Sequence, residues 1–220
     1  MARYLILGAG KFGRLALERL SGQEAQAEFL VVERASQALA AARSLTSARA
    51  QWLEAEAGAF LAESLNQAEA WDWLIPAIPE HVAFIWLRQG LLAGTDWETI
   101  EVPALVATLT PLAIRGREGE LYLSRARHLC PDDCAEPEVC PVTGEPRETP
   151  LYEELAALEV PGFRTAVISS RQLAPGVGGF PPVRLAALAQ ELADLGGKAL
   201  VATACRCHGV VHALERRSRE

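Results

Sequence analysis

Residues 3–33 read RYLILGAGKFGRLALERLSGQEAQAEFLVVE, and the fold class follows from this stretch. An apolar run at 3–7 ends at a glycine, apolar side chains recur at helical spacing over 11–20, and a second apolar run covers 29–32. A strand, a glycine turn, a helix and a second strand make the βαβ unit from which parallel sheets are built. The chain is therefore predicted to be an α/β protein with a Rossmann-like parallel sheet.

The turn after the first strand is a G-x-G-x-x-G motif. Gly8 would allow the tight turn, Gly10 would let the backbone approach a pyrophosphate, and Gly13 would let the helix lie close to the sheet. Glu33 follows Gly13 by 20 residues. A carboxylate there binds the ribose hydroxyls and repels a 2′-phosphate, which favours NAD over NADP, although the neighbouring Arg34 weakens that preference. The predicted cofactor-binding residues are Gly8, Gly10, Lys11, Phe12, Gly13 and Glu33, and a purely structural turn is the alternative.

The stretch YLILGAGKFGRLALERL…FLVVE resembles the NAD-binding domain of potassium-transport regulators. It also resembles the first unit of saccharopine-dehydrogenase-like proteins. The resemblance covers about the first hundred residues. It implies NAD binding, and it implies either a regulatory or a dehydrogenase role.

Further elements follow along the chain. Strands are expected at 50–53, 72–78, 104–109, 165–169 and 199–204, with an edge strand or hairpin arm at 121–126. Helices are expected at 36–45, 57–68, 80–92, 151–158 and 183–195, the last preceded by a glycine-rich loop at 176–179. Three arginines at 216, 217 and 219 are expected to form a solvated tail. The predicted organisation is a dinucleotide-binding domain at 1–110, edge strands and an acidic cysteine-rich loop at 111–150, and a smaller C-terminal α/β unit at 151–220.

The five cysteines fall into two groups. The first group has C-x3-C-x5-C spacing in an irregular, proline-rich segment, and the second is C-x-C just past a predicted strand. Soft thiolates bind zinc or the irons of an iron–sulfur cluster. Neither spacing fits the usual C-x2-C zinc knuckle, so an iron–sulfur cluster is preferred over zinc. The predicted metal ligands, shared between the two groups, are Cys130, Cys134, Cys140, Cys205 and Cys207.

Other roles for these cysteines remain open. A redox thiol or disulfide pair is one alternative, and plain burial is another. His128 and His208 flank the two groups and are candidate ligands or proton donors, although a position outside the ligand set is the commoner one for such histidines. His81 follows the fourth strand and is a candidate for proton transfer.

The net charge of the chain argues against one class of partner. The formal net charge is −7, so a nucleic-acid partner is not expected. Residues 128–160 hold nine acids and a single base, Arg147. No apolar run is long enough for a membrane span and no signal peptide is visible, so a cytoplasmic protein is expected.

The leading hypothesis is an NAD-binding oxidoreductase whose metal–thiolate centre lies near the nicotinamide. The alternative is a non-catalytic protein that senses nucleotide and redox or metal state. A third hypothesis is a metal-trafficking or assembly factor. A redox or regulatory protein partner and a homo-oligomer are compatible with each of them.

Overall fold

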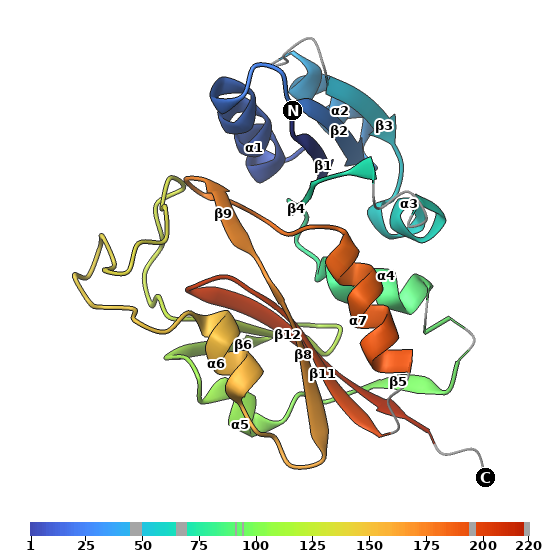
Figure 1. Ribbon diagram of the computed structural model, residues 1–220, viewed down its shortest axis with the longest axis vertical. Helices are drawn as coiled ribbons and strands as arrows, with labels where there is room; N and C mark the ends of the chain where they lie inside the picture. The colour runs from blue at the N-terminus through green and yellow to red at the C-terminus, as the bar shows by residue number, and fades with distance from the viewer. Residues whose placement is uncertain (45–49, 65–69, 91, 94, 194–196, 218–220) are drawn as a thin grey trace.

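The computed structural model describes residues 1–44, 50–64, 70–90, 92–93, 95–193 and 197–217. Its N-terminal part is a parallel sheet in the order β3(Ala50–Glu54), β2(Glu28–Glu33), β1(Arg3–Leu7), β4(Trp73–Pro76). Three helices connect these strands, namely α1(Lys11–Gln23), α2(Ser36–Arg43) and α3(Ala57–Ser64). Figure 1 shows this sheet with its helices at the top of the molecule. The expected mixed α/β class and the parallel sheet are confirmed.

Six of the later strands form a second sheet, and β9(Arg171–Ala174) and β10(Val177–Gly179) form a separate two-stranded hairpin. The order of the second sheet is β6(Leu112–Arg115), β7(Leu121–Ser124), β12(His208–Arg216), β11(Lys198–Ala204), β8(Phe163–Ser169), and β5(Trp97–Ile100) also pairs with β12. Strands β11 and β8 run parallel and the other pairs are antiparallel. The helices that accompany this sheet are α4(Val82–Gln89), α5(Ala104–Ala107), α6(Leu151–Ala157) and α7(Val183–Ala193).

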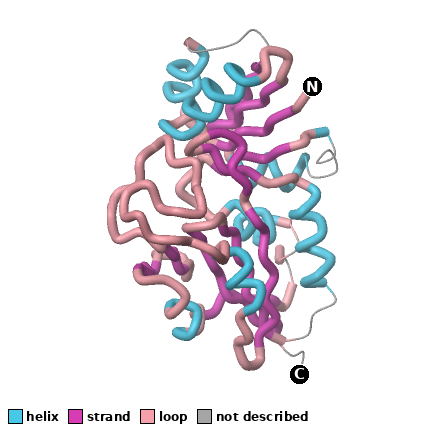
Figure 2. Tube along the Cα trace, turned by 60° about the vertical axis from the view of Figure 1, so that its left-hand side comes forward, coloured by secondary structure: helices cyan, strands magenta, loops and turns pink. Residues whose placement is uncertain are grey.

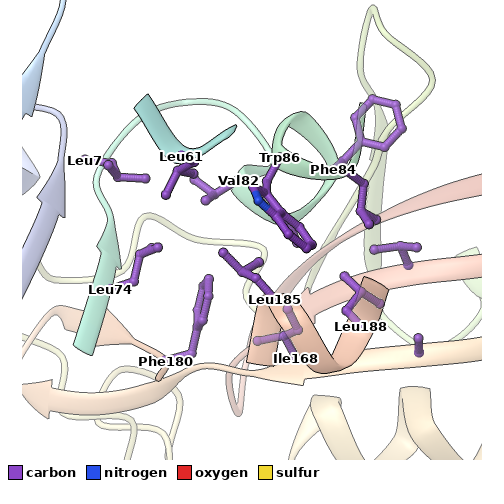
Figure 3. Close-up of a cluster of buried hydrophobic side chains, with 14 of the residues drawn as sticks. Leu7, Leu61, Leu74, Val82, Phe84, Trp86, Ile168, Phe180, Leu185 and Leu188 are labelled. Atoms are coloured by element: carbon purple, nitrogen blue, oxygen red, sulfur yellow. The ribbon is translucent and has the colours of Figure 1, made fainter. Parts of the chain in front are cut away.

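One hydrophobic core joins the two sheets. Leu5 and Leu7 of β1 point into it, whereas Tyr4 and Ile6 point to a separate core under α1, as alternation along a strand requires. Leu74 of β4 and Phe180 exchange two backbone hydrogen bonds of 2.8 and 3.0 Å. These bonds attach the chain at Phe180 to the edge of the first sheet. Figure 3 shows Leu7, Leu74 and Phe180 facing α4 and α7 side chains across this core.

The cysteine-rich segment has little regular structure. Figure 2 shows the path between β7 and α6 as a broad excursion of loop. It lies beside the hairpin of β9(Arg171–Ala174) and β10(Val177–Gly179), which occupies the expected glycine-rich loop. Gly176 has φ +67° at the tip of this hairpin. A Cβ there would lie 1.8 Å from the carbonyl oxygen of Asp132, so the glycine is required where the cysteine-rich segment crosses.

Two of the predicted elements are wrong. The strand expected at 104–109 is the short helix α5, which starts after Pro103 and buries Val106 completely, and the nearby strand is β5 at 97–100. Proline at the helix start costs no hydrogen bond, so the apolar run closes as a turn of helix. The expected arginine tail begins inside β12, where Arg216 pairs with Trp97, and Arg217 donates to Glu98.

Parts of four predicted helices, at 45, 65–68, 91 and 194–195, lie outside the described residues, as does Arg219. In the part of the chain that the structure describes, no helix is long and apolar enough to cross a bilayer.

Gly13→Ala should destabilise the chain. A Cβ at Gly13 would lie 1.9 Å from the carbonyl oxygen of Gly8, so either α1 or the turn must move. We expect the free energy of unfolding to fall by roughly 1–3 kcal/mol. Gly22→Ala on the same helix is the control, because nothing lies within 4 Å of its added Cβ. Urea denaturation of both variants provides the measurement, and equal stabilities would contradict the packing argument.

Candidate functional site

The glycine turn lies where β1, β2 and β4 meet. Gly8 has φ +102°, and a Cβ on it would lie 2.7 Å from the carbonyl oxygen of Ala77. The Gly8 N–H donates to the Val32 carbonyl at 2.8 Å. Gly10 differs, because its φ is −68° and a Cβ there would meet nothing within 4 Å. The turn therefore leaves open space at Gly10, at the N-terminus of α1.

Glu33 holds the turn from the end of β2. One carboxylate oxygen accepts the Ala9 N–H at 2.9 Å and the other accepts the Ala35 N–H at 2.8 Å. Each oxygen has a further lone pair for a ligand hydroxyl. Glu33 lines a cleft of about 200 Å³ with Gly8, Gly10, Arg34 and Glu56, among others. Burial would raise the pKa of Glu56, but the N–H groups of Ala59 and Gly58 hold it below its ordinary value. The cleft therefore carries two carboxylates, those of Glu33 and Glu56, beside the guanidinium of Arg34.

The cysteine-rich segment is fastened to α1 and to the β9–β10 hairpin. Lys11 and Asp132 form an ion pair of 2.5 Å, and Arg19 donates to the backbone carbonyls of Asp132 and Pro175. The Cys134 carbonyl accepts from the Gly176 N–H at 2.9 Å and from the Gln172 amide at 2.8 Å. These contacts place the first cysteine group next to the glycine turn.

Four of the five cysteines line one pocket of about 480 Å³. The segment supplies Cys130 and Cys134, and the turn between β11 and β12 supplies Cys205 and Cys207. Phe12, at the start of α1, lines the same pocket. The structure thus brings the two cysteine groups together and sets them against the predicted cofactor residues.

Arg147 stands at the centre of the thiols and is only 7% exposed. Its guanidinium donates to Cys207 Sγ. Burial would lower the pKa of Arg147, but the thiols of Cys207, Cys140 and Cys130 raise it. A buried cation needs negative charge close by, and here cysteine sulfur is its partner. The sequence carried a signal for this residue that we did not use, because Arg147 is the single base among nine acids.

Cys140 is buried beside this pocket rather than in its wall. The Cys140 N–H donates to the Glu145 carbonyl at 2.9 Å, and the Gly144 N–H donates to the Cys140 carbonyl at 2.8 Å. Hydrogen bonds from Thr143 and from the Val142 N–H lower the pKa of Cys140. Burial and the neighbouring Cys134 raise the pKa of Cys130. The turn at Cys140 is thus built to stabilise a thiolate.

His208 lies between two sulfur atoms. Its Nε2 is 3.8 Å from Cys130 Sγ, and its Nδ1 is 3.9 Å from Cys205 Sγ. Burial lowers the pKa of His208 and raises that of Cys205. Glu136 completes a group with Cys205 and His208 in which one ligand atom of each lies within 4.8 Å of the others. Sequence reasoning missed Glu136, since nothing distinguishes it among the acids of its segment.

Four adjoining pockets, each sharing lining residues with a neighbour, make up one groove. The cleft at Glu33 shares Ala77, Ile78 and Pro79 with a second cavity of about 430 Å³, and that cavity shares Phe12 and Ser170 with the cysteine pocket. A further pocket of about 540 Å³ shares Pro79, Ser170, Cys205 and His208 with this groove. A molecule bound at Glu33 can therefore extend to the thiols.

A buried histidine pair lies beside this last pocket. His81 Nδ1 and His212 Nδ1 are 2.9 Å apart, His81 Nε2 is 3.0 Å from Thr203 Oγ1, and Phe84 stacks on His212 with ring centroids 3.6 Å apart. Burial, reinforced by His212, holds the pKa of His81 well below its ordinary value. Burial also lowers the pKa of His212 to about 4. The pair is therefore neutral at pH 7.

Because of the His81–His212 pair, the free energy of unfolding should fall as the pH is lowered. Both folded pKa values lie below the unfolded value of about 6.5, so the unfolded chain takes up protons first. The stabilisation is complete above pH 6.5 and is lost toward pH 4, and His212 alone accounts for about 3 kcal/mol. Urea denaturation across this range should give a shallower pH profile for His212→Phe than for the wild type. Parallel profiles would contradict the assignment.

Comparison with known proteins gives three findings. A family model described as "Uncharacterized protein, C-terminal domain" matches residues 70–217, which include β4, the second sheet and all five cysteines. A protein of Archaeoglobus fulgidus, printed as "Uncharacterized protein", is 29% identical over 222 residues, which cover 96% of this chain and 99% of that protein. No solved structure matches.

Proposed function

The chain belongs to the family described as "Uncharacterized protein, C-terminal domain", and we propose that it is an NAD-binding redox protein with a cysteine-ligated metal centre. The single observation that carries the proposal is the groove of adjoining pockets, because each pocket shares lining residues with the next from Glu33 to the thiols. The nucleotide would lie with its adenosine ribose at Glu33 and its pyrophosphate over Gly10. Its nicotinamide end would then reach the cavity at Phe12 and Ser170.

Three features of the first sheet support a Rossmann-type nucleotide site. The strand order 3-2-1-4 is that of a mononucleotide-binding half with its first crossover point beside β1. Helix α1 begins at Lys11 and Phe12, after Gly10, and no side chain caps its first turn. A phosphate there would meet backbone N–H groups and the positive end of the helix dipole. Glu33 ends β2, where a ribose-binding carboxylate belongs.

The spacing of the thiols supports a cluster over a single ion. Ligand sulfurs on one tetrahedral zinc ion lie about 3.8 Å apart, given bonds of about 2.3 Å. Among the described residues, the one group with ligand atoms within 4.8 Å of one another is Glu136, Cys205 and His208, so the remaining four cysteines are spread too widely for one ion. An iron–sulfur cluster is larger than one ion and is therefore the centre that we propose for these four thiols. Cys130, Cys134, Cys140 and Cys207 would hold it.

Arg147 suits the charge of such a centre. Thiolate-bound clusters and tetrathiolate zinc are anionic, and a hydrogen bond to a ligand sulfur from a buried guanidinium offsets that charge. The metal centre would exchange electrons or polarise a substrate. The residues of the chain would place the nucleotide, exclude water and compensate charge. A one-electron carrier protein is the class of redox partner that we propose for the cluster, since iron–sulfur clusters take up and release single electrons.

Glu33 should make NAD bind more tightly than NADP. The carboxylates of Glu33 and Glu56 would repel the 2′-phosphate of NADP by about 1–4 kcal/mol at close range, which is about fivefold or more in affinity. Glu33→Gln should shrink this ratio, while Glu28→Gln, at the opposite end of β2, should leave it unchanged. Calorimetric titration with both nucleotides provides the measurement. Tighter binding of NADP by the wild type would show that Glu33 does not meet the ribose.

A further inference from the structure

We propose that Glu136, Cys205 and His208 bind one divalent ion of the zinc class, with a coordination position left open toward the apolar pocket that His81 lines. This site is separate from the four remaining cysteines, and it requires neither a nucleotide nor a cluster. Its ligands would be a carboxylate oxygen, a thiolate sulfur and an imidazole nitrogen, a mixed set that suits zinc and its neighbours in the first transition row.

The distances suit one ion. The three ligand atoms lie within 4.8 Å of one another, and His208 Nδ1 is 3.9 Å from Cys205 Sγ. Two ligands on a tetrahedral zinc ion, one sulfur and one nitrogen, are about 3.6 Å apart. Closing this gap takes a few tenths of an ångström. The ion would replace the proton that Cys205 shares with the Glu136 carboxylate by hydrogen bonding.

The backbone already orients each ligand. Cys205 and His208 close the turn between β11 and β12, where the Cys205 N–H donates to the His208 carbonyl at 2.8 Å and the His208 N–H approaches Cys205 Sγ at 3.3 Å. Glu136 has φ +51°, and its carboxylate accepts the Arg206 N–H at 3.3 Å. The site is thus preformed on a rigid hairpin and one loop residue.

The second nitrogen of His208 is occupied. Its Nε2 lies 3.8 Å from Cys130 Sγ, so an ion on Nδ1 leaves Nε2–H to donate to the Cys130 sulfur. Ligating histidines usually donate their other N–H to an acceptor that fixes the ring, and here the Cys130 sulfur would be that acceptor. The two imidazole nitrogens point in different directions. An ion bound at Nδ1 therefore lies on the side of the ring away from Cys130.

Three protein ligands leave a tetrahedral ion with one free position. Cys205 and His208 line both the cysteine pocket and the pocket of about 540 Å³. The walls of the latter are largely apolar, with Ile78, Val82 and Phe180 among them, and Thr203 and Ser170 supply hydroxyls. The free position would take an oxygen of a small, mostly apolar carbonyl compound or alcohol, which the ion would polarise.

Cobalt is the probe for this site, because Co2+ bound by a thiolate absorbs visibly. The full chain, purified without oxygen and dialysed against EDTA, is titrated with Co2+. We expect one ion per chain with a sulfur-to-cobalt charge-transfer band, and a shift of the cobalt spectrum when azide is added as an exogenous ligand. A spectrum without the sulfur band, or one that azide leaves unchanged, would overturn the assignment.

Variants separate this site from the thiol centre. Glu136→Gln and His208→Gln should each weaken Co2+ binding at least tenfold, and Cys205→Ser should abolish the sulfur band. Glu138→Gln, an exposed acid two residues from Glu136, is the matched control and should bind as the wild type does. If Cys134→Ser removes the sulfur band while Glu136→Gln keeps it, the ion belongs to the other cysteines. Should Cys205→Ser fail to fold, Co2+ binding by Glu136→Gln still tests the site. Glu136 lies in a loop, so its replacement should leave the fold intact.

Discussion

Replacing Cys207 with serine should remove most of the metal from the chain and lower its melting temperature. Cys207 is buried and its Sγ accepts a hydrogen bond from the Arg147 guanidinium, so its loss takes away one proposed ligand and the acceptor of a buried guanidinium. Cys134→Ser should have the same effect, although Cys134 comes from the other cysteine group. A metal that binds only the folded chain at 1,000 times its Kd stabilises it by about 4 kcal/mol, or roughly 10 °C for a chain of this size.

Metal analysis and thermal unfolding of the purified variants provide the measurement. Ala135→Ser is the matched control, because it adds the same hydroxyl next to Cys134 at an exposed position. Loss of metal in one cysteine variant with full retention in the other would show that the two groups act separately. Retention in both would mean that these thiols bind no shared metal.

Gly10→Val should abolish NADH binding while the fold is kept. A Cβ at Gly10 meets nothing within 4 Å in the protein, so a valine side chain would occupy the space in which we propose the pyrophosphate. The backbone at Gly10 has φ −68°, which valine accepts without strain. We expect affinity to fall at least 100-fold, about 3 kcal/mol.

Calorimetry with NADH measures this effect, and thermal unfolding verifies the fold. Gly22→Val, near the far end of α1, is the control, since its added Cβ also meets nothing within 4 Å. Unchanged NADH affinity in Gly10→Val would remove the nucleotide from the glycine turn. A large fall in melting temperature would instead assign Gly10 to the packing of the turn.

Local pattern predicted the first sheet well. Strands β1 and β2 are apolar on both faces and end at a glycine and a carboxylate, so periodicity and turn chemistry agree there. The second sheet was harder, because β12 pairs with β5 and β7 from distant parts of the chain as well as with the adjacent β11, and begins inside the C-x-C-H motif. The largely apolar stretch VVHAL at 210–214, which directly follows the cysteine motif, was not predicted as a strand but lies within β12.

The site was predictable only where residue type reveals the chemistry. The cysteines stood out by their grouping, and the structure brings four of them to one pocket. Arg147 and Glu136 are ordinary residues whose importance comes from burial and from contacts 60 to 70 positions away. Such long-range pairings depend on how the loop crosses the β9–β10 hairpin, and no local pattern encodes that crossing.

Metal analysis of the wild-type chain purified without oxygen tests the central claim most directly. The account predicts bound iron with inorganic sulfide and the broad visible absorption of thiolate-ligated iron. Zinc bound in place of iron would contradict the cluster and leave the cysteine-ligated centre. A folded chain that carries neither metal, and takes up neither when reconstituted, would contradict the cysteine-ligated centre itself.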